Sequence, residues 1–159
     1  MGESFQREFE RIKSLRYIQK TQLVVDFLNW AQVELGKYQD SNRTDKTPNF
    51  RGPYERTLLS YAAMADCTEL TNYLLRRGAL KDDCDQDGRT SLSWAAEYGA
   101  LATAKILVNH KADVNAKCDN GSTPLTWLRF AGSNDEATRD TEAYLIQMGA
   151  IGETLVKLH

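Results

Sequence analysis

The sequence predicts an all-α solenoid in which pairs of helices stack side by side and short hairpin loops join the pairs. A phrase that starts with threonine and holds an aromatic residue occurs three times, as TLLSYAA at 57–63, TSLSWAA at 90–96 and TPLTWLR at 123–129. The copies lie 33 residues apart, and a second apolar phrase follows each of them at 74–79, 107–115 and 145–150. A period of this length is typical of helical units that bury their apolar faces only by stacking on one another.

These phrases resemble the ankyrin-repeat family, whose pattern is Thr-Pro-Leu-His-x-Ala-Ala, a turn, a helix ending in Leu-Leu, and then Gly-Ala-Asp-Val-Asn-Ala. Residues 85–117 match this pattern best, whereas Ser or Thr replaces the family's His in all three copies and its Pro is present only as Pro124. The resemblance covers residues 54–151 and implies three repeats, at 54–84, 85–117 and 118–151.

The N-terminal part, residues 1–39, is expected to form a helical cap that lies outside the repeat pattern. Apolar residues at three- and four-residue steps predict helices over 4–19 and 21–38. The second of these is apolar on many sides, which favours burial against the open end of the first repeat. The alternative is a helix pair that binds another chain. A polar, turn-rich connection is expected at 40–53, and residues 153–159 form a tail.

Within the repeats, helix and turn signals alternate. In the second repeat Thr90 should start the inner helix, Tyr98 and Gly99 should end it, and residues 101–110 should form the outer helix. The hairpin tips contain Asp-Gly at 87–88 and Asn-Gly at 120–121. These dipeptides favour a tight turn in which both central residues have positive φ. The residues predicted to form the core are Leu59, Leu74, Leu92, Ile106, Leu107, Leu125 and Leu145.

The third repeat departs from the other two. An insertion lies within residues 131–140, and Leu128 and Arg129 replace the Ala-Ala pair that lets neighbouring inner helices approach closely. Both features are expected of a terminal repeat that has no successor.

Composition and charge limit the classes of function. The shares of hydrophobic (42%) and charged residues (26%) are ordinary for a globular protein. The N-terminus lacks the apolar core of a signal peptide, so a cytoplasmic or nuclear location is expected. The three cysteines and two histidines have no metal-ligand spacing, and a net charge of −2 argues against general nucleic-acid binding. Neither a metal, a cofactor nor a membrane partner is expected.

Function is expected to reside in binding, because no catalytic constellation or phosphate-binding loop occurs in the sequence. Tyr61, Trp94 and Trp127 share one phase of the repeat and should form a column on the concave side, with Trp94 as the energetic centre. The alternative is that these rings fill the gap between inner helices and hairpins. The residues predicted to contact a partner are Tyr61, Met64, Asp87, Arg89, Trp94, Glu97, Tyr98, Trp127 and Phe130.

Two classes of function remain open at this point. The first, which the resemblance implies, is a non-catalytic module that binds another protein or peptide on its concave face. The alternative is a small-molecule-binding protein or atypical enzyme with a pocket between the repeats and the N-terminal helices. An open aromatic strip favours the first class, and a closed cavity with convergent polar groups favours the second.

Overall fold

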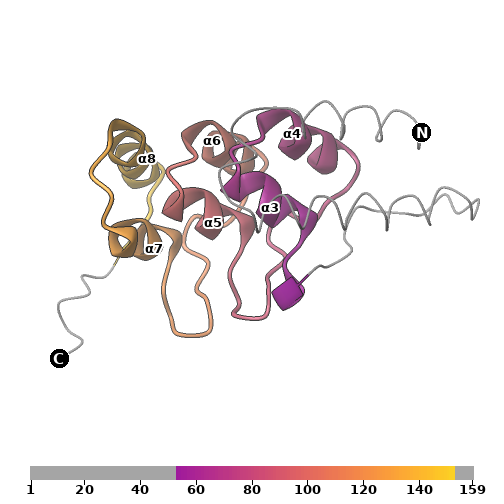
Figure 1. The fold of residues 1–159 in the computed structure, drawn as a ribbon, viewed down its shortest axis with the longest axis horizontal. Helices are drawn as coiled ribbons and strands as arrows, with labels where there is room; N and C mark the ends of the chain where they lie inside the picture. Colours follow the sequence, from indigo (N-terminus) through magenta and orange to yellow (C-terminus); the bar gives the residue numbers. More distant parts are fainter. Residues whose placement is uncertain (1–52, 153–159) are drawn as a thin grey trace, which may run out of the picture.

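The computed structural model describes residues 53–152, and the expected cap, tail and all but the last residue of the connection lie outside this range. The described part contains no strand, so the predicted all-α class is confirmed there. Its elements are a 3-10 turn η2 (Pro53–Glu55) and the helices α3 (Leu58–Met64), α4 (Thr68–Arg76), α5 (Ser91–Glu97), α6 (Leu101–Asn109), α7 (Pro124–Ala131) and α8 (Glu136–Gln147). In Figure 1 the inner helices α3, α5 and α7 form one row, the outer helices α4, α6 and α8 form a second, and the hairpin loops extend to one side.

The repeated threonine sets the start of each inner helix. The side-chain oxygens of Thr57, Thr90 and Thr123 each accept a hydrogen bond from the backbone N–H three residues further on, at 3.1–3.3 Å. Such a cap satisfies one of the N–H groups that a helix leaves without an internal partner. Because helices of seven or eight residues are marginal alone, their stability depends on packing against the neighbouring pairs.

The core lies between the two rows of helices. Leu59, Leu74, Leu92, Leu107, Leu125 and Leu145 are buried there, as the sequence predicted. Ile106 is only half-buried, so its assignment to the core was wrong. The buried face of α6 consists of Thr103, Ala104 and Leu107. Ile106 is rotated about 100° from Leu107 around the helix axis, so its side chain lies at the edge of that face.

The hairpin turns differ from the expected type. The Gly88 N–H donates to the Asp85 carbonyl (2.9 Å) and the Asp85 N–H donates to the Arg89 carbonyl (3.0 Å). Only the glycine of each pair, with φ of 78° at Gly88 and 84° at Gly121, has positive φ. This is the longer hairpin loop in which a left-handed glycine follows the turn. The prediction of two central residues with positive φ was therefore wrong.

Each hairpin is bonded to the segment that precedes it in the stack, which is η2 for the first hairpin and the first hairpin for the second. The Gln86 N–H donates to the Tyr54 carbonyl (3.0 Å), and the Asp119 N–H donates to the Asp87 carbonyl (2.9 Å). These bonds align the hairpins beside the inner helices and fix one wall of the concave side. No helix in residues 53–152 combines the length and the apolar composition that crossing a membrane requires.

Candidate functional site

The three aromatic residues of equal phase do lie along one side of the inner helices, and two arginines lie between them. The Arg89 Cζ atom is 3.5 Å from the ring centroid of Trp94 and 3.8 Å from that of Trp127. The Arg56 Cζ atom is 4.6 Å from the Trp94 centroid and 5.8 Å from that of Tyr61. We call this alternating series, Tyr61–Arg56–Trp94–Arg89–Trp127, the arginine–aromatic stack. Each guanidinium faces electron-rich ring faces, which attract cations.

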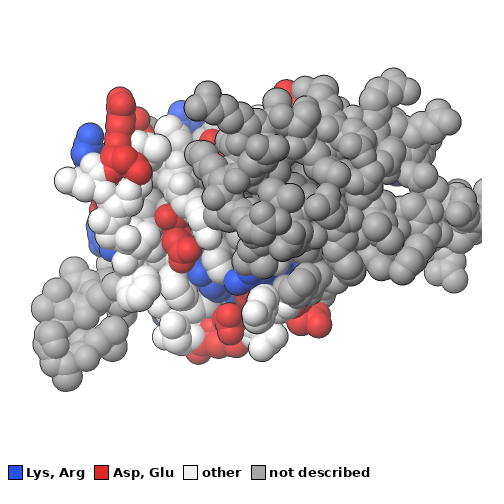
Figure 2. Space-filling model, viewed as in Figure 1, with Lys and Arg blue, Asp and Glu red and all other residues white. Residues whose placement is uncertain are grey.

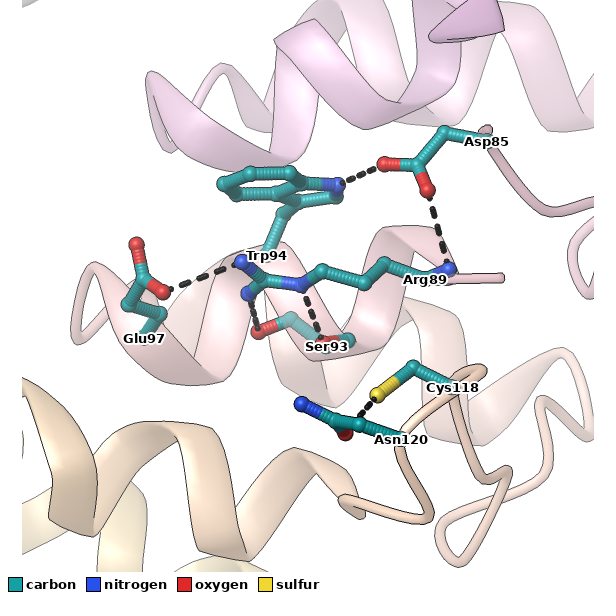
Figure 3. A network of polar contacts seen from close by, with 7 residues as sticks. All are labelled: Asp85, Arg89, Ser93, Trp94, Glu97, Cys118 and Asn120. Atoms are coloured by element: carbon teal, nitrogen blue, oxygen red, sulfur yellow. Dashed lines mark hydrogen bonds and ion pairs between the residues drawn. The ribbon is translucent and has the colours of Figure 1, made fainter. Parts of the chain in front are cut away.

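Polar contacts fix the centre of the arginine–aromatic stack (Figure 3). The Trp94 indole N–H donates to the Asp85 carboxylate (2.9 Å), whose other oxygen accepts from the Arg89 backbone N–H (3.0 Å). The Arg89 side chain donates to the Ser93 hydroxyl (3.0 Å), the Ser93 carbonyl (3.3 Å) and the Glu97 carboxylate (3.1 Å). The guanidinium is therefore held both by its faces and by its edge.

Burial shifts the ionisation of groups in the arginine–aromatic stack. Burial lowers the pKa of the Arg89 guanidinium, and the carboxylates of Glu97 and Asp85 oppose that shift. Burial also raises the pKa of the Tyr61 phenol, with Arg56 acting in the opposite direction. In both groups burial disfavours the charged form, and the neighbouring groups named here favour it.

Exposure divides the predicted contact residues into two groups. Tyr61 and Met64 are buried, and Trp94 is only 6% exposed, so these positions do not form an open strip. Their burial favours the alternative in which these rings fill the space between helices and hairpins. By contrast, Tyr98 is 46% and Phe130 64% exposed.

The exposed aromatics pack on the rings of the column. The Tyr98 ring centroid lies 6.4 Å from that of Trp94, and Phe130 meets the half-buried Trp127 edge-on at 5.7 Å. Asp87 is exposed at the tip of a hairpin. In Figure 2 acidic side chains gather along the lower edge of the molecule, where Figure 1 places the hairpins.

Sequence reasoning missed the parts played by Arg56, Asp85 and Ser93. A signal for the two arginines is present, because Arg56 and Arg89 each precede an aromatic residue of the column by five positions. A sequence signal for Asp85 is also present, because an aspartate at the first position of a hairpin commonly accepts hydrogen bonds from the backbone of the turn that follows. Among residues 53–152 no group of His, Cys, Asp and Glu side chains is arranged to hold a metal ion.

The repeat pattern also has a counterpart among known proteins. The family model for ankyrin repeats matches the chain in three copies, over residues 22–118 and 59–136, so the match starts within the segment expected to be a cap. The chain is 35% identical over 82 residues to 26S proteasome non-ATPase regulatory subunit 10 of Dictyostelium discoideum, which covers 51% of this chain and 35% of that protein. It is 43% identical over 67 residues to the ankyrin repeat and KH domain-containing protein mask of Drosophila melanogaster, a match that covers 42% of this chain and 2% of that protein.

A third relative, alpha-latrocrustotoxin-Lt1a of Latrodectus tredecimguttatus, is 36% identical over 110 residues, which cover 67% of this chain and 7% of that protein. The chain thus spans about a third or less of the length of these relatives. The 33-residue period, the antiparallel helix pairs and the family match agree. This chain belongs to the ankyrin-repeat family.

Proposed function

We propose that the chain is a non-catalytic module that binds a segment of another protein on its concave face, at the ends of α5 and α7. Ankyrin-repeat domains are generally protein-binding modules. The observation that carries the proposal is the exposure of Tyr98 and Phe130, two large aromatic side chains that each rest on a ring of the column. Aromatic residues of this kind dominate the energetics of protein interfaces.

The arginine–aromatic stack supports this proposal through its rigidity. Trp94 is held by Asp85, and Arg89 is held between two indoles. A surface that is already ordered loses little conformational freedom when a partner binds, so more of the contact energy appears as affinity. In this proposal Trp94 supports Tyr98 from beneath, and the centre of the contact lies at Trp127 and Phe130.

The same geometry weighs against a flat ligand between two rings of the column, whereas a pocket between the repeats and the N-terminal helices would involve residues outside the described range. The guanidinium groups of Arg56 and Arg89 occupy the spaces between successive rings. A flat ligand would have to displace a stacked cation to enter between two rings. No observation on the described residues favours an enzymatic site.

The test is selection of peptides from a random phage-displayed library on the whole chain, followed by affinity measurements on the synthetic peptides. We expect Tyr98→Ala and Phe130→Ala each to weaken the selected peptides about 5- to 30-fold, as truncation of an interface aromatic does. Ile146→Ala is the matched control, because Ile146 is 50% exposed but lies on the outer helix α8. Urea unfolding of all three variants shows whether a loss of binding is a loss of fold.

Retained affinity in both aromatic variants would overturn the proposal. So would a loss of affinity in Ile146→Ala alone, because the binding surface would then lie on the outer helices.

A further inference from the structure

The arginine–aromatic stack follows a rule that the third repeat breaks. Each arginine lies five residues before an aromatic residue of the column and lies over the ring of the next repeat. Arg89 stacks between Trp94 and Trp127. Arg56 lies over Trp94 (4.6 Å) and Tyr54 (4.9 Å), and it donates a hydrogen bond to the Tyr61 hydroxyl (3.5 Å). The position five residues before Trp127 is Ser122. The face of Trp127 that points away from Arg89 therefore lacks the guanidinium that the rule would supply.

The backbone at Ser122 is arranged as it is at Arg89. The Gly121 N–H donates to the Cys118 carbonyl (2.8 Å) and the Cys118 N–H donates to the Ser122 carbonyl (3.0 Å). The hairpin before Arg89 has the same two bonds at the equivalent positions. The second and third repeats therefore differ here in their side chains and not in their backbone. The Cα atom of an arginine at position 122 would occupy the position in its hairpin that the Cα atom of Arg89 occupies.

The other side chains of the third repeat also hold the Trp127 ring by fewer polar contacts than hold the Trp94 ring in the second repeat. Cys118 stands where Asp85 holds the Trp94 indole, and its thiol instead donates to the Asn120 side-chain oxygen (2.7 Å). The Trp127 indole N–H is buried and has no acceptor. Phe130, 64% exposed, stands where the second repeat has Glu97.

We propose that the outer face of Trp127 accepts an arginine side chain of the partner protein, which continues the arginine–aromatic stack between chains. This inference rests on the proposed function, because it assumes that the concave face binds protein. The planar guanidinium is the group that lies over a tryptophan ring in both other repeats, Arg56 over Trp94 and Arg89 over Trp94 and Trp127, and a compact ammonium lacks that flat surface. The apolar stem of the arginine would pack beside Phe130.

The surrounding charge suits a cationic segment. Residues 53–152 carry fourteen Asp and Glu and ten Lys and Arg. The two arginines of this face are already held in the stack, and Arg129 nearby is bound to Glu142 at 2.9 Å. Asp87 and Asp119 are exposed on the hairpins. The field of these carboxylates attracts a basic segment and raises its rate of association.

The experiment uses two blocked pentapeptides, acetyl-Gly-Leu-Arg-Leu-Gly-amide and the same peptide with citrulline, which keeps the shape of arginine but not its charge. The readout is the indole N–H resonance of Trp127 in a nitrogen-15 correlation spectrum of the whole chain, assigned with Trp127→Phe. We expect the arginine peptide to shift this resonance and the citrulline peptide to bind about tenfold more weakly, the size of one partly desolvated cation–ring contact.

Two variants locate the site. Ser122→Arg supplies the missing arginine within the chain and should abolish the shift that the arginine peptide causes. Gln147→Arg adds the same charge at an exposed position of α8 and should leave the shift unchanged. The citrulline comparison needs no variant, so it remains decisive if Ser122→Arg fails to fold.

An unmoved Trp127 resonance, or equal affinity for the two peptides, would overturn the inference. The proposed function would stand separately if library-selected peptides still required Phe130 but did not require arginine.

Discussion

Replacement of Arg89 by alanine tests whether the arginine–aromatic stack stabilises the fold. The side chain is buried, with both faces of its guanidinium against indole rings and its edge on Ser93 and Glu97. Alanine removes these contacts together and leaves the Glu97 carboxylate, 22% exposed, without its cation. We expect a large loss of stability and no change of fold class.

The magnitude follows from the individual contacts. A cation–ring contact contributes from about 0.5–1 kcal/mol when exposed to about 2 kcal/mol when desolvated, so the two contacts of Arg89 contribute about 2–4 kcal/mol. The hydrogen bonds of the guanidinium add about 1–2 kcal/mol, and relief from burying a charge offsets a similar amount. The expected loss in the free energy of unfolding is therefore about 2–4 kcal/mol.

Equilibrium urea unfolding followed by circular dichroism measures this loss. With a urea dependence of about 1.3 kcal/mol per molar, the midpoint should fall by about 1.5–3 M. Arg89→Lys keeps the charge but loses the planar fork and should lose about half as much. Arg76→Ala, at an exposed position at the end of α4, is the control and should change stability by less than about 0.5 kcal/mol.

Unfolding of Arg89→Ala and Arg76→Ala at the same urea concentration would show that the arginine–aromatic stack does not stabilise the fold. Equal stability of Arg89→Lys and the unaltered protein would show that stacking of a planar group contributes nothing beyond charge.

Three further predictions concern single residues. Gly88→Ala should destabilise more than Gly121→Ala in urea unfolding, although both have positive φ, because a Cβ atom at 88 would lie 2.5 Å from a carboxylate oxygen of the next hairpin and one at 121 meets nothing within 4 Å. Thr90→Ala should cost about 1 kcal/mol of stability, and Thr90→Ser should restore most of it. Ellman's reagent at pH 8 should label exposed Cys84 rapidly and Cys67 only after unfolding, because burial raises the pKa of the Cys67 thiol.

Much of the fold could be predicted because its determinants are local and repeat. The threonine before each inner helix acts through a hydrogen bond to a residue three positions away. The buried leucines of the inner helices, Leu59, Leu92 and Leu125, recur every 33 residues, and so do Leu74 and Leu107 of the first two outer helices. Leu145 of the third pair lies 38 residues after Leu107, because of the insertion within residues 131–140. The assignment of Ile106 to the core was wrong because α6 buries only one face, and Leu107, the next residue, already occupies that face.

The candidate site was harder to predict, because it depends on where long side chains end. Phase places the Cα atom of an arginine, but several rotatable bonds separate that atom from the guanidinium. The five-residue spacing therefore indicates that each arginine belongs with an aromatic residue, but it does not show that the Arg89 guanidinium separates Trp94 from Trp127. The turn type failed for a related reason. The Asp85 carboxylate accepts the N–H groups of Asp87 and Arg89, which favours the longer loop over the two-residue turn that Asp-Gly prefers.

In the last helix pair two neighbouring exposed positions, 129 and 130, differ in polarity, and this difference supports the proposed location of the binding surface. Ala96 lets α7 pack on α5, and Arg129 stands at its equivalent on α7, bound to Glu142 and the Gly152 carbonyl. That position is polar and satisfied, so it needs no further contact. Phe130, the next residue, is apolar and 64% exposed. We therefore expect Phe130, rather than Arg129, to contact a partner, because burial of Phe130 would remove its apolar surface from water.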